Sequence, residues 1–227
     1  MKVIAVANQK GGVGKTTTAV NLSAALSELE QRVLLIDIDP QGNATMGSGV
    51  EKNQLSLSSY EWLLEGAGLR EVVHTKEAKY DILPSNIDLT AAEVGLLGME
   101  SREYVMRDLL SGAAYDYVLI DCPPSLNILT VNALTAADTV LIPMQCEYYA
   151  LEGLSALLET IKALRVSSNP QLDIEGLLRT MYDPRISLSR DVSRQLVTHF
   201  GEKLFRTVIP RNIKLAEAPS HGRPVIA

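Results

Sequence analysis

The chain has 227 residues, of which 46% are hydrophobic, and its net charge is −6 from 21 Lys and Arg against 27 Asp and Glu. This length allows one α/β domain with a well-filled core, and we expect a single domain over residues 1–227. No stretch approaches the roughly 18 apolar residues of a membrane span or has the form of a signal peptide, so we expect a cytosolic protein. The two cysteines, Cys122 and Cys146, lack the spacing of a metal site and are expected to be reduced thiols in the core.

A glycine-rich segment, residues 10–17, lies between an apolar run at residues 3–7 and an alanine- and leucine-rich segment that ends near Leu29. This order predicts a strand, a loop and a helix. The glycines let consecutive backbone N–H groups point at one anion, and the helix N-terminus adds its positive dipole end. Lys15 can reach outer phosphates, and the Thr16 hydroxyl can ligate Mg²⁺. The sequence therefore predicts an ATP or GTP site whose nucleotide-binding residues are Lys10, Gly11, Gly12, Val13, Gly14, Lys15, Thr16 and Thr17.

Two further apolar runs end in carboxylates. Residues 32–36 form one such run, which predicts a buried strand of a parallel sheet and delivers Asp37 and Asp39 to the same edge as the glycine loop. Residues 37–45, with Pro40 and Gly42, are expected to form a loop beside the phosphates. The second run, residues 115–121, ends in Asp121. Asp121 resembles a Walker B aspartate, which can hold Mg²⁺ directly or through water. The alternative for Asp121 is an aspartate that only caps a turn.

Strand and helix patterns alternate along the rest of the chain. Ser58 and Glu61 have the spacing of a capping box for a short helix. Further strands are expected at 80–84, 115–121, 138–143, 174–181 and 204–209, and further helices at 91–97, 103–110, from about 148 to 165, and 192–200. This alternation predicts an α/β fold with a twisted, mainly parallel β-sheet flanked by helices on both faces.

The last quarter of the chain is basic although the whole chain is acidic. Residues 179–227 hold nine Lys and Arg against four Asp and Glu, a local charge of +5, so residues 1–178 carry −11. Such a segment is a candidate polyanion-binding face. On charge alone, a solvated face without a ligand is the alternative.

The glycine loop departs from the general P-loop pattern, because Gln9 stands where the pattern needs glycine and Lys10 opens the loop. Residues 8–17 resemble the "deviant Walker A" loop of the ParA/Soj partition ATPases, and residues 145–153 and 207–224 are also similar to that family. The resemblance implies a single-domain P-loop NTPase that hydrolyses ATP slowly with Mg²⁺. It places the segment Pro210, Arg211 and Asn212 near the adenine.

The resemblance also implies roles for individual residues. ATP would join two monomers face to face, with Lys10 reaching the partner's phosphates and Asp39 orienting or deprotonating the attacking water. The catalytic residues would be Lys10, Lys15, Asp39 and Asp121, and the metal site Thr16, Asp39 and Asp121. Non-specific DNA would contact Arg185, Arg211 and Arg223. The implied partner is a ParB-type centromere-binding protein, and the implied location is the bacterial nucleoid in the cytoplasm, with no membrane contact.

Other ATPases share the lysine-containing loop. A MinD-like regulator would end in an amphipathic membrane helix, a relative of the nitrogenase iron protein would need cluster-binding cysteines in another place, and a tyrosine autokinase would carry a tyrosine-rich tail. The sequence favours the partition ATPase over these three. Family members usually continue for about 25–30 residues beyond the position of Ala227 and end in a helix, so either the sequence is cut there or this branch of the family is short.

Overall fold

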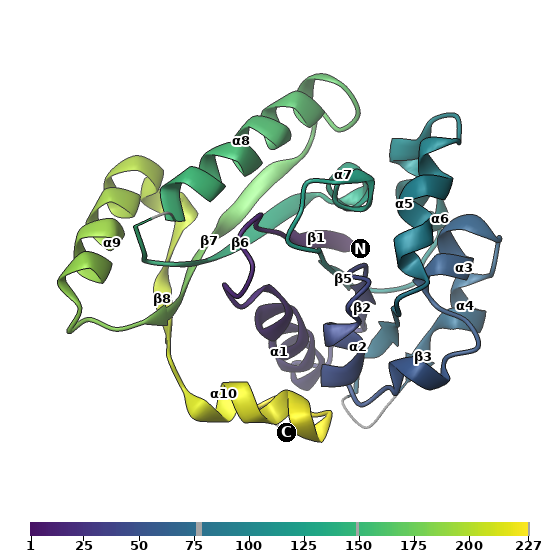
Figure 1. Ribbon diagram of the computed structural model, residues 1–227, viewed down its shortest axis with the longest axis horizontal. Coiled ribbons are helices and arrows are strands. Elements are labelled where there is room, and N and C mark those ends of the chain that lie inside the picture. Colours follow the sequence, from purple (N-terminus) through teal and green to yellow (C-terminus); the bar gives the residue numbers. More distant parts are fainter. Residues whose placement is uncertain (76–78, 149, 227) are drawn as a thin grey trace.

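The computed structural model describes residues 1–75, 79–148 and 150–226, and over these residues the chain forms one eight-stranded sheet (Figure 1). The strand order is β3-β4-β2-β5-β1-β6-β7-β8, and every pair is parallel except β3 with β4. The strands are β1 (Lys2–Val6), β2 (Val33–Asp37), β3 (His74–Thr75), β4 (Asp81–Leu83), β5 (Tyr117–Asp121), β6 (Thr139–Gln145), β7 (Asp173–Tyr182) and β8 (Leu204–Pro210). The predicted α/β fold with a mainly parallel sheet is confirmed.

Helices cover both faces of this sheet. They are α1 (Lys15–Glu28), α2 (Asn43–Gly47), α3 (Ser59–Leu64), α4 (Leu69–Val72), α5 (Leu89–Leu97), α6 (Val105–Leu109), α7 (Ile128–Ala136), α8 (Ala150–Val166), α9 (Ser187–Phe200) and α10 (Ile213–Glu217). Short 3₁₀ turns occur at Lys52–Gln54, Arg102–Tyr104, Gly201–Lys203 and Ala218–His221. Helices α1 and α2 pack on one face, and α3 to α9 pack on the other.

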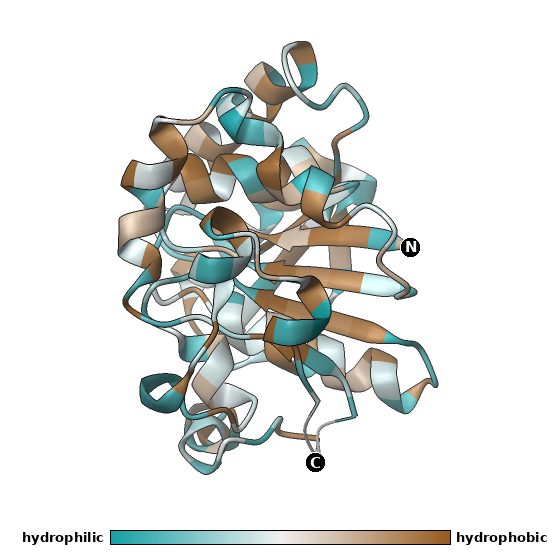
Figure 2. Ribbon diagram, turned by 90° about the vertical axis from the view of Figure 1, so that its right-hand side faces the viewer, coloured by the Kyte–Doolittle hydropathy of each residue, from teal (hydrophilic) through white to brown (hydrophobic). Residues whose placement is uncertain are grey.

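Alternating residues of strands β1, β2, β4, β5 and β6 divide the core into two layers. In β1, Val3 and Ala5 join the layer beneath α3 to α9, whereas Ile4 and Val6 join the layer beneath α1 and α2. A strand whose side chains are buried on both faces needs apolar residues at consecutive positions, which explains the continuous apolar runs in the sequence. Figure 2 shows these strands as largely hydrophobic segments between the helices.

Several local expectations hold. Ser58 accepts a hydrogen bond from the Tyr60 N–H, and Glu61 Oε2 accepts one from the Ser58 N–H at 2.7 Å, so the capping box that begins α3 is confirmed. Both cysteines are buried free thiols. The predicted helix from about 148 to 165 is present as α8, although Tyr149 lies outside the described residues.

Other expectations were wrong. The stretch 37–45 is not all loop, because α2 begins at Asn43 after Gly42, which takes a left-handed conformation. Helix α7 was not predicted, and α9 begins at Ser187 rather than at 192. The first residues of α9 are polar or exposed and therefore give no helical apolar stripe.

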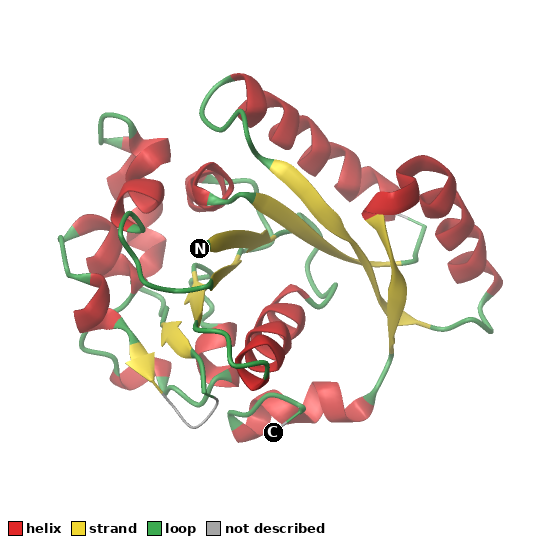
Figure 3. Cartoon of the chain, turned by 180° about the vertical axis from the view of Figure 1, so that it is seen from behind, coloured by secondary structure: helices red, strands yellow, loops and turns green. Residues whose placement is uncertain are grey.

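The end of the chain returns to the helix that follows the glycine loop. After β8, the segment with α10 crosses below α1 (Figure 3), and the Val225 N–H donates to Asn21 Oδ1 at 2.7 Å. The residues after β8 therefore lie on the face of the sheet that α1 and α2 cover. Within the described part of the chain, no helix has both the length and the apolar character needed to cross a bilayer.

Candidate active site

The glycine loop joins β1 to α1 and is held by hydrogen bonds of two side chains, Asn8 after β1 and Thr180 in β7. Asn8 Nδ2 donates to the Pro143 carbonyl at 2.8 Å, and Asn8 Oδ1 accepts from the Lys10 N–H at 3.0 Å. Across the loop, Thr180 Oγ1 donates to the Val13 carbonyl at 2.7 Å. Gly14 has φ +86°, a conformation that residues with a Cβ rarely adopt, and it leads directly into α1. These hydrogen bonds hold the loop in its shape.

Lys15 lies over this loop. Its ammonium Nζ donates to the Lys10 carbonyl at 3.0 Å, and the residue is buried, with 7% of its surface exposed. Burial lowers the pKa of Lys15, and the neighbouring Asp121 and Asp39 carboxylates oppose that shift. An ammonium in this setting gains from an anion beside it, because an opposite charge restores the favourable environment that burial removes.

Thr16 and Asp121 meet at the start of α1. Thr16 Oγ1 donates to Asp121 Oδ2 at 2.7 Å, whereas Asp121 Oδ1 is buried and has no hydrogen-bond partner. Burial raises the pKa of Asp121 well above its usual range, and the adjacent Asp37 carboxylate raises it further. A buried carboxylate oxygen without a donor fits a cation, and the Thr16 hydroxyl next to it is a second hard oxygen ligand. These residues therefore fit the predicted magnesium site.

No cluster of three or more His, Cys, Asp or Glu side chains able to hold a metal exists among residues 1–75, 79–148 and 150–226.

Asp39 lies two residues beyond the end of β2. It is 8% exposed, and its Oδ1 accepts a hydrogen bond from the Gln41 N–H at 2.9 Å. The register of the sheet places Asp37 opposite Asp121, so both aspartates of the 37–39 segment reach the edge where β5 ends. Burial raises the pKa of Asp37 to about 6, despite hydrogen bonds from Thr45 that act in the other direction. The predicted juxtaposition of the three carboxylates is therefore present.

A cleft of about 1290 Å³ opens along this edge. Its polar end is lined by glycine-loop residues, by Asp39 and by the segment after β8, and it continues over the apolar face between α1 and β8. The predicted site residues that line it are Gly11, Gly12, Gly14, Lys15, Thr16, Thr17, Asp39, Pro210, Arg211, Asn212 and Arg223. Val13 and Asp121 are buried beneath its wall.

Two predicted residues point elsewhere. Lys10 Nζ forms an ion pair with Glu147 Oε2 at 2.6 Å, outside the residues that line the cleft. Arg185 lies in the turn after β7, where its guanidinium pairs with Asp183 at 2.7 Å and 88% of its side chain is exposed. The three arginines proposed for DNA therefore divide into two at the cleft and one outside it.

Sequence reasoning missed the residues that support the site from a distance. Asn8 follows β1 and was visible only as part of a motif, and Thr180 lies within β7 without any local signal. Ser85, whose hydroxyl donates to the Asp39 carbonyl at 2.9 Å, comes directly after the short strand β4 and Pro84. For Asn8 and Ser85, a position just after a strand was the single available signal.

A family described as AAA domain matches residues 1–174. The chain is 50% identical over 231 residues to the chromosome partitioning protein ParA of Caulobacter vibrioides, which covers 100% of this chain and 86% of that protein. It is 50% identical over 228 residues to the sporulation initiation inhibitor protein Soj of Bacillus subtilis, covering 99% of this chain and 90% of that one. The chain belongs to the ParA/Soj family of chromosome-partitioning ATPases.

Membership of the ParA/Soj family agrees with the solved structures that this chain resembles. A structure of cobyrinic acid a,c-diamide synthase from Mycobacterium smegmatis, with a bound ATP analogue and magnesium, has a TM-score of 0.89 and 40% sequence identity. The match covers 98% of this chain and 93% of that chain. The predicted family and its ATP hydrolase activity are therefore confirmed, and proteins similar to this one bind adenine nucleotides with magnesium.

Proposed function

We propose that this chain binds Mg-ATP in the cleft, dimerises on ATP, binds duplex DNA without sequence preference, and drives chromosome or plasmid partition with a ParB-type partner. The observation that carries the proposal is the cleft, which brings the glycine loop, Asp39 and residues 210–212 to one edge of the sheet. In the cell, such a protein acts in the cytoplasm on the nucleoid.

The cleft has a phosphate end and a base end. At the phosphate end, the backbone N–H groups of the loop and the Lys15 ammonium hold the β- and γ-phosphates; this ammonium has three donors, of which the Lys10 carbonyl takes one. At the base end, Asn212 Oδ1 accepts the Lys214 N–H at 2.9 Å, so its amide nitrogen can donate to a base edge. Backbone groups of Pro210 and Arg211 complete the contacts to adenine.

Thr16 and Asp121 would hold the magnesium ion, together with Asp39, which lines the cleft. Mg²⁺ bound there neutralises negative charge on the phosphates. The unpartnered Oδ1 of Asp121 is the protein atom best prepared for this role, because it is buried and receives no hydrogen bond.

Asp39 is the proposed catalytic residue for the attacking water. Its Oδ1 is fixed by the Gln41 N–H, and the carboxylate lines the cleft beside the phosphate end. A carboxylate held at this place can orient the water or accept its proton. Since phosphoryl transfer depends mostly on positioning and on neutralising charge, Asp39 and the lysines together supply what the reaction needs.

Lys10 supplies a second positive charge, which we propose contacts the phosphates of the nucleotide bound to the partner subunit. Its side chain is 32% exposed and directed away from its own cleft lining toward Glu147. Two monomers facing each other would bring each Lys10 to the other's γ-phosphate, so that each site is complete only in the dimer.

DNA binding is assigned to the basic last quarter of the chain. A non-specific complex made of a few phosphate contacts has a dissociation constant near 10⁻⁴–10⁻⁶ M, and doubling the contacts by dimerisation strengthens binding and steepens its salt dependence. Arg185 is the leading contact because 88% of its side chain is exposed and it lies outside the cleft, whereas Arg211 and Arg223 line the cleft.

The test is a salt titration of the Asp39→Ala protein on random duplex DNA, with ATP and with ADP. We expect binding with ATP only, and the variant Arg185→Glu should lower the salt slope by about 1 per protomer. Arg107→Glu is the matched control, because Arg107 also pairs with a nearby aspartate but lies on α6. Binding that ignores salt, or that is equal with ADP, contradicts the proposal.

The alternative function is that of a MinD-like spatial regulator. Such a protein would bind anionic vesicles in the presence of ATP, and it would need no DNA. Co-sedimentation of the ATP-loaded protein with vesicles containing phosphatidylglycerol, without binding to duplex DNA, would favour that alternative.

A further inference from the structure

A closed set of buried hydrogen bonds lies beneath the loop that carries Asp39. Thr45 Oγ1 donates to Asp37 Oδ2 at 2.7 Å and accepts from the Ser85 N–H at 2.8 Å. Ser85 Oγ donates to the Asp39 carbonyl at 2.9 Å, and the Asp39 N–H donates to Asp37 Oδ1 at 3.1 Å. Four residues from three segments thus form one ring.

This ring fixes the backbone of Asp39 on both sides. Its N–H is held by Asp37, and its carbonyl is held by the Ser85 hydroxyl together with the Gly42 N–H at 2.9 Å. The loop and the Ser85 segment are also in close steric contact, because a Cβ at Gly42 would lie 2.7 Å from the Ser85 carbonyl oxygen. Asp39 therefore has little freedom to shift along the loop.

Thr45 and Ser85 are fully buried, with 0% exposure, and the ring satisfies both hydroxyls. Such a satisfied, buried network makes a segment rigid, since breaking one bond leaves a polar group without water or partner. Nearby Ser59 gives the contrast: it is equally buried, and its hydroxyl has no hydrogen-bond partner. The bonds of Ser85 are therefore not a general property of buried serines in this region.

We propose that Thr45 and Ser85 are positioning residues for ATP hydrolysis, which act by fixing the Asp39 backbone so that its carboxylate stays aimed into the cleft. This inference rests on the proposed catalytic role of Asp39. Neither hydroxyl lines the cleft, so both act through Asp39 and touch no part of the substrate. Displacement of a catalytic group by about 1 Å can cost on the order of 100-fold in rate, so losing one of the two bonds to the carbonyl should cost about 10-fold.

The first experiment measures kcat and KM for ATP in Ser85→Ala, with Ser59→Ala as the matched control. We expect kcat of Ser85→Ala to fall about 10-fold while KM changes less than about twofold, because the phosphate-binding loop is untouched. Ser59→Ala should keep the wild-type kcat. A wild-type kcat in Ser85→Ala, or an equal loss in Ser59→Ala, would overturn the inference.

A second experiment compares the kcat of a conservative and a non-conservative change of Thr45. Thr45→Ser keeps the hydroxyl and should keep kcat within about twofold, whereas Thr45→Val keeps the shape, loses the hydroxyl and should lower kcat at least as much as Ser85→Ala. Equal kcat values for the Ser and Val variants would overturn the inference. Should Thr45→Val fail to fold, Ser85→Ala still decides.

A double-mutant cycle separates positioning from general stability. In the Asp39→Ala background, adding Ser85→Ala should lower the melting temperature as it does in the wild type but should not lower the residual kcat further. An additional 10-fold loss would show that Ser85 acts apart from Asp39. If Asp39→Ala itself hydrolysed ATP at the wild-type rate, the proposed function would fail. If Asp39→Ala lost ATP hydrolysis but Ser85→Ala kept the wild-type kcat, only the positioning role would be rejected.

Discussion

Lys10 and Glu147 form an ion pair at the rim of the glycine loop, with Lys10 Nζ donating to Glu147 Oε2 at 2.6 Å. The two residues are 137 positions apart, and the pair joins the loop after β1 to the segment after β6. If Lys10 acts on the partner's phosphates, this pair must open first. In the monomer, Glu147 thus binds the Lys10 ammonium that we assign to the partner's phosphates in the dimer.

We predict that Glu147→Gln makes dimerisation easier. An exposed ion pair contributes about 0.2–1 kcal/mol, so releasing it should lower the dimer dissociation constant with ATP by roughly 1.4- to fivefold for each pair. Sedimentation velocity across a range of protein concentrations measures this change. Glu159→Gln, which breaks an exposed pair with Lys162 on α8, is the control, and Lys10→Ala should bind ATP yet remain monomeric. Weaker dimerisation in Glu147→Gln would show that Glu147 supports the dimer instead.

Lys15→Ala should lose ATP affinity. Hydrogen bonds to charged groups contribute about 1.5–3 kcal/mol, which corresponds to a loss of roughly 10- to 100-fold. Calorimetric titration with ATP and Mg²⁺ checks this, and Lys162→Ala serves as the control for removing an exposed lysine. An unchanged affinity in Lys15→Ala would refute the assignment of the loop to phosphates.

Asp121→Asn should keep the stability of the ligand-free protein but remove the effect of Mg²⁺ on ATP affinity. Burial disfavours the charged form of Asp121, so removing the charge should leave the melting temperature of the ligand-free protein unchanged or higher. The gain in ATP affinity that Mg²⁺ gives over EDTA should disappear, because the proposed metal ligand is lost. Asp116→Asn, at an exposed carboxylate before β5, should keep that gain. A full magnesium effect in Asp121→Asn would remove Asp121 from the metal site.

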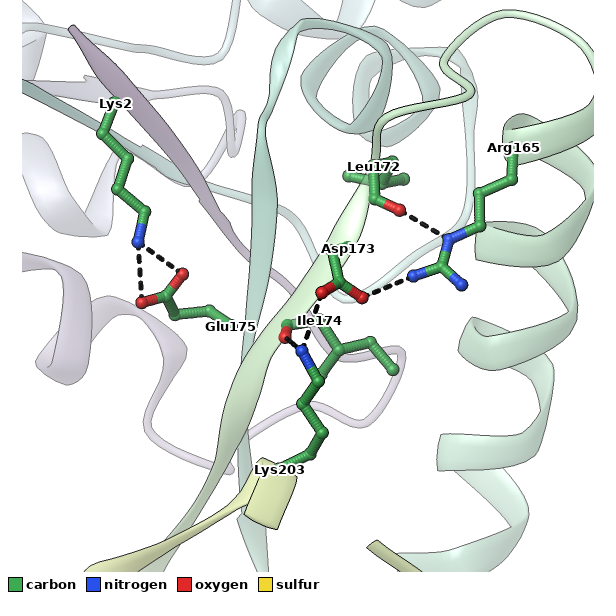
Figure 4. A network of polar contacts seen from close by, with 7 residues as sticks. All are labelled: Lys2, Arg165, Leu172, Asp173, Ile174, Glu175 and Lys203. Carbon is green, nitrogen blue, oxygen red and sulfur yellow. Dashed lines mark hydrogen bonds and ion pairs between the residues drawn. The ribbon is translucent and has the colours of Figure 1, made fainter.

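The pH dependence of stability should include a contribution from Asp173, which binds Arg165 at 2.6 Å and Lys203 at 2.7 Å (Figure 4). The hydrogen bond from Lys203 is the main cause that lowers its pKa below the ordinary 3.8. The ionised carboxylate therefore stabilises the fold above pH 3.8, and that contribution is lost as pH falls through the folded-state pKa.

We expect Asp173→Asn to cost about 0.5–1 kcal/mol near pH 7, or roughly 1–4 °C in melting temperature. The difference from the wild type should shrink as the pH falls below 4. Thermal unfolding followed by circular dichroism at several pH values measures both numbers. A difference that stays constant from pH 7 to pH 3 would mean that packing, and not charge, is lost.

The edge of the sheet that carries the chemistry was predictable, because residues that end parallel strands must meet there. Asp37 and Asp121 follow this rule and stand opposite each other in the β2–β5 register. Helix α7 was not predictable from periodicity: most of its residues, polar ones such as Asn132 included, are buried, so no polar face marks it.

The residues that hold the site in place could not be predicted from the sequence either. Thr180 binds the Val13 carbonyl across 167 positions, and Ser85 binds the Asp39 carbonyl across 46. Each contact depends on strand order and on the exact path of a loop, and neither leaves a local pattern. The residues that contact phosphate carry recognisable chemistry, whereas the residues that hold them in place are ordinary threonines and serines.

The central claim is that ATP in the cleft turns a monomer into a dimer, and the mass of the Asp39→Ala protein in solution tests it most directly. Removing Asp39 should stop hydrolysis while Lys10, Lys15 and the magnesium ligands Thr16 and Asp121 remain. Multi-angle light scattering with Mg-ATP should give about twice the 24.7 kDa of one chain, and with Mg-ADP the mass of one chain. A mass that stays at one chain in saturating ATP, or that is doubled equally with ADP, would contradict the account.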